Sequence, residues 1–91
     1  MISVQQAKYE GHYKVWLKFN DGKEGVVDLV DIPSHYKSAA PLLDEKVFAS
    51  FFLDEWPTLA WSCGFDLSPE FLYERLTGRK PIWADSMFIA A

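Results

Sequence analysis

Residues 59–73 read LAWSCGFDLSPEFLY, and this stretch places the main helix of the chain. It contains a short apolar strand, a glycine turn and a helix start. Ser68 is a favoured N-cap residue, and Pro69 suits the first helical position because its missing N–H is not needed there. Glu70 adds a negative charge at the positive end of the helix dipole, and Leu67 and Leu72 occupy the two positions of a hydrophobic staple. The stretch therefore predicts a helix that begins at residue 69.

The residues that follow predict where this helix ends. Gly78 is typical of a left-handed C-cap, so the helix is expected over residues 69–77. Residues 81–91, PIWADSMFIAA, are strongly apolar, whereas chain ends are commonly polar and mobile. We therefore expect a single domain over residues 1–80 and an apolar C-terminal segment, residues 81–91, that docks on the domain or on a partner.

A second hairpin is predicted just before the opening stretch. Residues 51–53 and 58–61 are expected to pair as strands around a turn at residues 55–57. Asp44 is a candidate N-cap for a short helix that precedes this hairpin. Within the less regular stretch 31–41, Pro33 and Pro41 bracket residues 34–40, which fit either a helical turn or a loop.

The first third of the chain predicts a three-stranded antiparallel meander. Residues 13–19, YKVWLKF, alternate between apolar and polar positions almost without fault, which is the signature of a half-buried strand. The set expected to face the core is Tyr13, Val15, Leu17 and Phe19. Residues 2–9, with an irregularity near Gln5 and Gln6, and residues 24–30 are the flanking strands. Turns are expected at residues 10–12 and at residues 20–22, where Asn-Asp-Gly is a strong hairpin signal.

Together these elements predict an α+β fold. It consists of a small antiparallel sheet, made of a three-stranded meander plus a second hairpin, with two short helices packed on one side. Ninety-one residues suffice for one domain with its own core.

The order of these signals resembles a known bacterial family, the domain of unknown function 2442. The resemblance spans residues 4–76, and its most specific part runs from Trp61 to Tyr73. One departure is visible, because the turn after Trp61 is Ser62-Cys63-Gly64 where the family commonly has Pro-Asn-Gly. The resemblance implies a small α+β fold and assigns no activity. Some relatives are joined to a helix-turn-helix domain and others lie next to a second small family in two-gene arrangements, which suggests regulatory or antitoxin-like binding proteins.

Composition and charge disfavour several classes of function. Nine basic and thirteen acidic residues give a formal net charge of −4. Nucleic-acid binding relies on Lys and Arg that neutralise phosphates, so direct contact with nucleic acid is not expected. The same charge balance opposes binding to an anionic membrane, and no apolar run approaches the roughly 20 residues that span a bilayer. A single cysteine and the lack of a signal-peptide pattern favour a cytoplasmic location.

The aromatic content predicts a protein interface. Aromatic residues make up 16% of the chain, including four Trp, which is more than one small core easily hides. Trp16 lies opposite the core-facing set, between Lys14 and Lys18. The lysine stems are expected either to cover its ring or to leave it as an interface anchor. The candidate interface residues are Trp16, Ile82, Trp83, Met87, Phe88 and Ile89.

No pattern of catalytic, metal-binding or cofactor-binding residues is found. His12, His35 and Cys63 are isolated in predicted turns and loops, without the spacing of a metal site or a nucleophile motif. Asp66 can accept backbone N–H bonds in the turn before the helix, and Glu70 complements the helix dipole in the first helical turn. A weaker alternative is a small pocket near Trp61, Cys63, Asp66 and Glu70.

The sequence therefore predicts a non-enzymatic interaction or regulatory module that resembles an antitoxin. Its expected partner is a second copy of the chain or a small protein encoded nearby. The alternative is a small ligand-binding domain or enzyme that uses the cleft near Trp61, Asp66 and Glu70.

Overall fold

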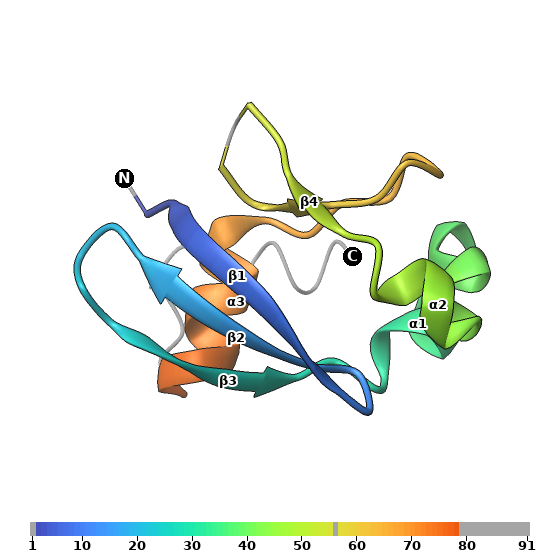
Figure 1. The fold of residues 1–91 in the computed structure, drawn as a ribbon, viewed down its shortest axis with the longest axis horizontal. Helices are drawn as coiled ribbons and strands as arrows, with labels where there is room; N and C mark the ends of the chain where they lie inside the picture. Colours follow the sequence, from blue (N-terminus) through green and yellow to red (C-terminus); the bar gives the residue numbers. More distant parts are fainter. Residues whose placement is uncertain (1, 56, 79–91) are drawn as a thin grey trace.

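The computed structural model describes residues 2–55 and 57–78 of the chain (Figure 1). Strands β1–β3 form one antiparallel sheet in that order, and β4 pairs with β5 in a separate two-stranded sheet. This α+β arrangement of a meander, a second hairpin and short helices confirms the predicted fold class. In chain order the elements are β1 Val4–Gly11, β2 Lys14–Phe19, β3 Glu24–Asp28, α1 Ile32–His35, the 3-10 helix η1 Lys37–Leu43, α2 Glu45–Phe48, β4 Phe52–Leu53, β5 Leu59–Ala60 and α3 Pro69–Thr77.

The alternation along β2 produces the predicted inner face. Val15, Leu17 and Phe19 are fully buried. Trp16, on the opposite side, is half-buried. Because successive side chains of a strand point to opposite faces, this pattern fixes which side of the sheet packs on the core.

The turn between β1 and β2 lies later than the sequence predicts, at His12 and Tyr13. Gly11, His12 and Tyr13 all have positive φ, at 89°, 54° and 63°. Positive φ at both central residues of a tight hairpin matches the right-handed twist of the two strands. Tyr13 is held in this conformation by its ring contact with Phe48, at 4.7 Å between centroids, and by its hydroxyl, which donates to the Leu43 carbonyl at 2.8 Å.

Two further features of the sheet are the register shift between β1 and β2 and the early end of β3. The β1–β2 register shifts between Val4 and Gln6, which confirms the predicted irregularity. β3 ends at Asp28, two residues before the expected end. There the Asp28 carboxylate accepts a hydrogen bond from the Val30 N–H at 3.0 Å and turns the chain away from the sheet.

Helix α3 has the predicted start and end. The Ser68 hydroxyl accepts from the Phe71 N–H at 3.1 Å, and Pro69 is the first helical residue. Gly78 adopts φ 74°, and its N–H donates to the Glu74 carbonyl at 2.7 Å.

Residues 31–48 form short helical segments rather than a loop. α1 and η1 occupy the region that the sequence left open, so the described chain has more helical pieces than the two expected. α2 begins as predicted, because the Asp44 carboxylate accepts from the Lys46 N–H at 2.9 Å. These segments group at one end of the three-stranded sheet (Figure 1).

Helix α3 covers the inner face of the three-stranded sheet (Figure 1). Tyr73 packs edge-on against Phe19, with 5.1 Å between the ring centroids. Gly25 of β3 admits Leu76 of α3, since a Cβ atom on Gly25 would lie 2.6 Å from Leu76 Cδ1. No helix in residues 2–55 and 57–78 is long and apolar enough to cross a membrane. The buried core consists of Val4, Val15, Leu17, Phe19, Val27, Leu29, Ile32, Ala39, Leu42, Phe48, Leu59, Trp61, Phe65, Leu67 and Leu72.

Candidate functional site

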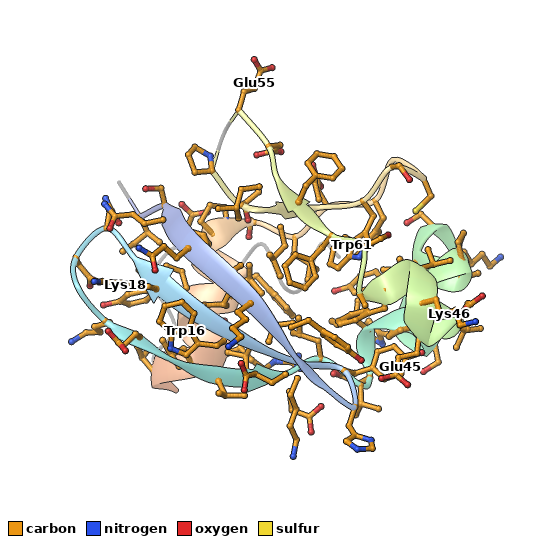
Figure 2. All side chains as sticks on the ribbon, in the orientation of Figure 1. Trp16, Lys18, Glu45, Lys46, Glu55 and Trp61 are labelled. Carbon is orange, nitrogen blue, oxygen red and sulfur yellow. The ribbon has the colours of Figure 1, made fainter. Side chains whose placement is uncertain are left out.

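Trp16 lies at the centre of the sheet surface that faces away from α3. The strand register places Lys8 directly beside it on β1 and Val26 directly beside it on β3. Val26 is 50% exposed, and Trp16 is half-buried. We call this surface the outer face, and the strand register places on it Gln6, Lys8, Lys14, Trp16, Lys18, Glu24, Val26 and Asp28. Figure 2 labels Trp16 and Lys18 on this face.

Charged side chains frame the apolar centre of the outer face. Lys18 is opposite Glu24 and Lys14 is opposite Asp28 across the β2–β3 ladder. Opposite charges at directly facing positions stabilise a sheet modestly. Such an arrangement, an aromatic centre with a charged rim, is the usual anatomy of a protein-binding surface.

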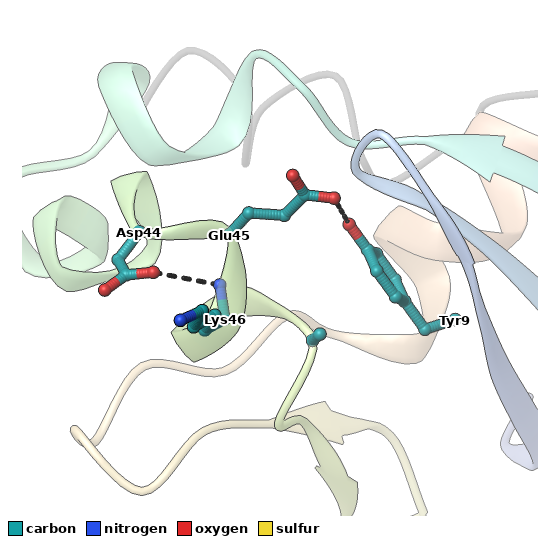
Figure 3. Close-up of a pocket in the computed structure, with 5 residues that line it drawn as sticks. Tyr9, Asp44, Glu45 and Lys46 are labelled. Carbon is teal, nitrogen blue, oxygen red and sulfur yellow. Dashed lines mark hydrogen bonds between the residues drawn. The ribbon is translucent and has the colours of Figure 1, made fainter.

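A separate hollow lies between β1 and α2 (Figure 3). Its volume is about 360 Å³, and it is open to solvent. The residues that line it are Tyr9, Asp44, Glu45, Lys46 and Ala49.

The hydrogen bonds at this hollow join the first hairpin to α2. The Tyr9 hydroxyl donates to the Glu45 carboxylate, which also accepts from the His12 N–H at 3.2 Å. The Tyr9 hydroxyl in turn accepts from the Tyr13 N–H at 3.2 Å. The otherwise strained turn at residues 12–13 is therefore tied to α2 by polar contacts.

The titration of these groups opposes acid–base catalysis near neutral pH. The hydrogen bond from Tyr9, and then the His12 N–H, hold the pKa of Glu45 below its ordinary value. Burial, and then the hydrogen bond to Glu45, raise the pKa of Tyr9. The carboxylate stays charged and the phenol stays neutral, whereas a general acid or base works best with a pKa near the operating pH. This cluster has a structural use.

Trp61 is a core residue. The residue is only 2% exposed, and its Nε1–H donates to the Phe48 carbonyl at 2.8 Å. Phe48, Phe51 and Phe65 surround it, with centroid distances of 5.5, 6.3 and 5.8 Å. The indole thus links α2, the second hairpin and the turn that follows it (Figure 2).

The other residues of the predicted pocket, Cys63, Asp66 and Glu70, lie close in sequence but differ in solvent exposure and in the element that holds them. Cys63 and Asp66 are exposed in the turn, where Gly64 has φ 98°. The backbone of Asp66 forms an isolated bridge with Ala60. Glu70 is half-buried in the first turn of α3. A ligand cleft at these residues stays a prediction.

The histidines occupy separate places. His12 is exposed in the first turn, and His35 ends α1 with its ring edge-on to Tyr36 at 4.6 Å. Within the described part of the chain, no three His, Cys, Asp or Glu residues converge as metal ligands. The predicted interface residues Ile82, Trp83, Met87, Phe88 and Ile89 lie outside the described residues.

The comparisons with known proteins give a family and a fold. A model for proteins of unknown function (DUF2442) matches residues 4–78. The chain belongs to this family. No curated protein matches it. Among solved structures, the Putative DNA Binding Protein from Nitrosomonas europaea is similar, with a TM-score of 0.75 and 21% sequence identity. The match covers 99% of this chain and 61% of that one, so this chain spans less than two thirds of its structural neighbour.

Two features of this DUF2442 protein were not predicted from its sequence. Val26 could have been found, because pairing across the turn at residues 20–22 places it beside Trp16. The contact between Tyr9 and Glu45 joins residues 36 positions apart. No local sequence pattern predicts such a contact, since it depends on how α2 packs against the first hairpin.

Proposed function

We propose that this chain is a non-enzymatic, cytoplasmic interaction module that binds a protein partner through the outer face. The observation that carries this proposal is Trp16 at the centre of an open sheet surface, beside the half-exposed Val26. Tryptophan is strongly enriched among the residues that dominate binding energy. The partner is a second copy of the chain or a small protein encoded nearby, in a regulatory, antitoxin-like complex.

The arrangement of charges supports a protein partner. Lysines on β1 and β2 and carboxylates on β3 give the outer face both signs of charge around an apolar centre. Charged groups at the rim of an interface set orientation and specificity, while a buried aromatic centre supplies most of the affinity.

Replacing Trp16 tests this function. The Trp16→Ala variant should weaken association by roughly 30-fold, the loss of about 2 kcal/mol that defines a binding hot spot. Solution mass over a concentration series tests self-association, and co-purification with the product of the adjacent gene tests a hetero-complex.

The matched control is Phe52→Ala. Phe52 is 48% exposed but lies on β4, away from the outer face. Its replacement should leave association unchanged, and circular dichroism should show both variants folded. A Trp16→Ala variant that assembles like the unmodified chain, by both measurements, refutes the proposal.

A second candidate is single-stranded nucleic acid. Three lysines, Lys8, Lys14 and Lys18, surround a ring on which a base can stack. The structural neighbour from Nitrosomonas europaea is named for DNA binding. The net charge of −4 opposes this function. Salt-dependent retention on immobilised DNA that disappears in Trp16→Ala would favour it over a protein partner.

A further inference from the structure

The charges of the outer face are separated by strand. Its lysines lie on β1 and β2, whereas its carboxylates, Glu24 and Asp28, lie on β3. In the part of the chain that the structure describes, no ion pair involves Lys14, Lys18 or Glu24. The Asp28 carboxylate accepts from the nearby Val30 N–H, and Asp28 is exposed. These charges are therefore available to a molecule that docks on the face.

The strand register sets the outer-face residues of β2 and β3 in three rows, each with one residue from each strand. The rows are Lys14 with Asp28, Trp16 with Val26, and Lys18 with Glu24. Each of the two flanking rows contains a cation on β2 and a carboxylate on β3, and the middle row contains two apolar side chains. An exchange of β2 for β3 therefore leaves every row complementary to itself.

A two-fold axis that runs parallel to the strands, midway between β2 and β3, performs this exchange. When a second copy is laid face to face on the first about this axis, the β2 strand of each copy lies over the β3 strand of the other, row on row. Trp16 of one copy then faces Val26 of the other, and each lysine of β2 faces a carboxylate. Because a two-fold interface is isologous, every one of these contacts forms twice.

The same charges disfavour the other two-fold arrangement, in which the axis runs across the strands. That axis brings Lys14 of one copy over Lys18 of the other, and the two carboxylates of β3 likewise face each other. Like charges that face one another at an interface are unfavourable and suppress the wrong orientation. The charge pattern therefore selects the axis that runs parallel to the strands.

The dimensions of the sheet predict a weak complex. Stacked sheets lie about 10 Å apart with their strands within about 30° of parallel, so long charged side chains from the two faces can meet. The six residues of β2 and three strands give a face of roughly 15 by 20 Å. Each partner of a standard interface buries roughly 800 Å². We therefore expect micromolar rather than nanomolar association.

We propose that the outer face binds a second copy of the same chain, related to the first by a two-fold axis parallel to the strands between β2 and β3. Trp16 and Val26 of the two copies form the apolar centre, and the lysine–carboxylate contacts fix the orientation. This inference rests on the function proposed above, and it names the partner and the orientation at that site.

Charge reversal tests this orientation. In Lys18→Glu, residue 18 of each copy faces Glu24 of the other, so two contacts become repulsive and association should weaken at least roughly 10-fold. Glu24→Lys should weaken association by a similar factor. An equimolar mixture of the two variants should restore association, because both facing pairs are then complementary. Sedimentation over a concentration series that reaches roughly 1 mM measures each sample.

The matched control is Lys46→Glu, which makes the same change in net charge on α2, away from the outer face (Figure 2). It should associate like the unmodified chain, and circular dichroism should show every variant folded. The mixture separates contacts between copies from contacts within one sheet, because mixing does not repair the pairing of residues 18 and 24 inside either chain. If a variant at these positions loses its fold, Lys14→Glu repeats the test in the other charged row.

Three results overturn this inference. They are a dimer that neither reversal weakens, a dimer that Lys18→Glu strengthens, and a mixture that does not restore association. An unmodified chain that stays monomeric throughout the series, yet binds the product of the adjacent gene through Trp16, overturns this inference and leaves the proposed function intact. If Trp16→Ala alters neither kind of association, the proposed function fails as well.

Discussion

Asp31 and Arg75 show how a single contact joins two elements that are distant in sequence. The guanidinium of Arg75, on α3, lies 2.7 Å from the Asp31 carboxylate, which precedes α1. This hydrogen bond is the main reason that the pKa of Asp31 lies below its ordinary value of 3.8.

Acid should weaken the fold partly through this pair. A carboxyl whose pKa is lowered in the folded state adds stability that is present above its unfolded pKa and is lost as the pH falls through the folded value. We therefore expect the contribution of Asp31 to be intact at neutral pH and to decline below about pH 4. Urea unfolding between pH 7 and pH 3 measures it.

The matched variants are Asp31→Asn and Arg75→Gln. Each should make the stability less dependent on pH in this window, and the double variant should add nothing further. If Asp31→Asn retains the acid dependence of the unmodified chain, the pair has no such role.

Single residues also show what can be predicted from local patterns. The outward position of Trp16 follows from the alternation of residues 13–19, and the exposure of Cys63 and Asp66 fits their place in a turn. The burial of Trp61 could not be derived in the same way. It depends on Phe48 and Phe51, at and just after the end of α2, and on Phe65, in the turn that follows the second hairpin.

At the scale of elements, α3 depends on its N-cap. Replacing Ser68 with Ala removes the acceptor for the Phe71 N–H and should lower the free energy of unfolding by about 1 kcal/mol. Chemical denaturation measures the change. Ser62→Ala, in the exposed turn that precedes the helix, is the control, and its effect should stay within about 0.5 kcal/mol. Equal effects of the two substitutions would show that the cap contributes nothing.

The bounds of a helix or strand could be predicted from the sequence where caps, turn residues or a regular apolar alternation mark that element. α3 has a cap, a proline and a terminal glycine, and β2 has a strict alternation, so both were identified closely. α1 and η1 are short and depend on tertiary contacts, since Ile32, Ala39 and Leu42 are buried in the core. Isolated helices of this length are not stable, so their sequence is only weakly constrained to look helical.

At the scale of the whole molecule, Trp61 connects the parts of the core. Trp61→Phe keeps an aromatic ring but leaves the buried Phe48 carbonyl without its donor. An unsatisfied buried group costs roughly 1–3 kcal/mol, and the loss should appear equally in probes of the sheet and of the second hairpin. Denaturation followed by circular dichroism and by amide exchange measures it.

Trp16→Phe is the matched control for this substitution. The ring of Trp16 lies on the outer face and is half-buried, so the change should cost no more than about 0.5 kcal/mol. A larger effect at Trp16 than at Trp61 would contradict the assignment of Trp61 as the centre of the core.

The sequence by itself determined the α+β class, the strand order of the meander, the second hairpin and the limits of α3. These features follow from alternation, turn residues and caps, which act over a few neighbouring residues. Only the tertiary structure decided that Trp61 is buried, that the Tyr9 hydroxyl donates to Glu45 and that the last turn of α3 packs on β3 at Gly25. Each of these depends on packing between segments far apart in the chain, where burial and hydrogen-bond satisfaction outweigh local preference.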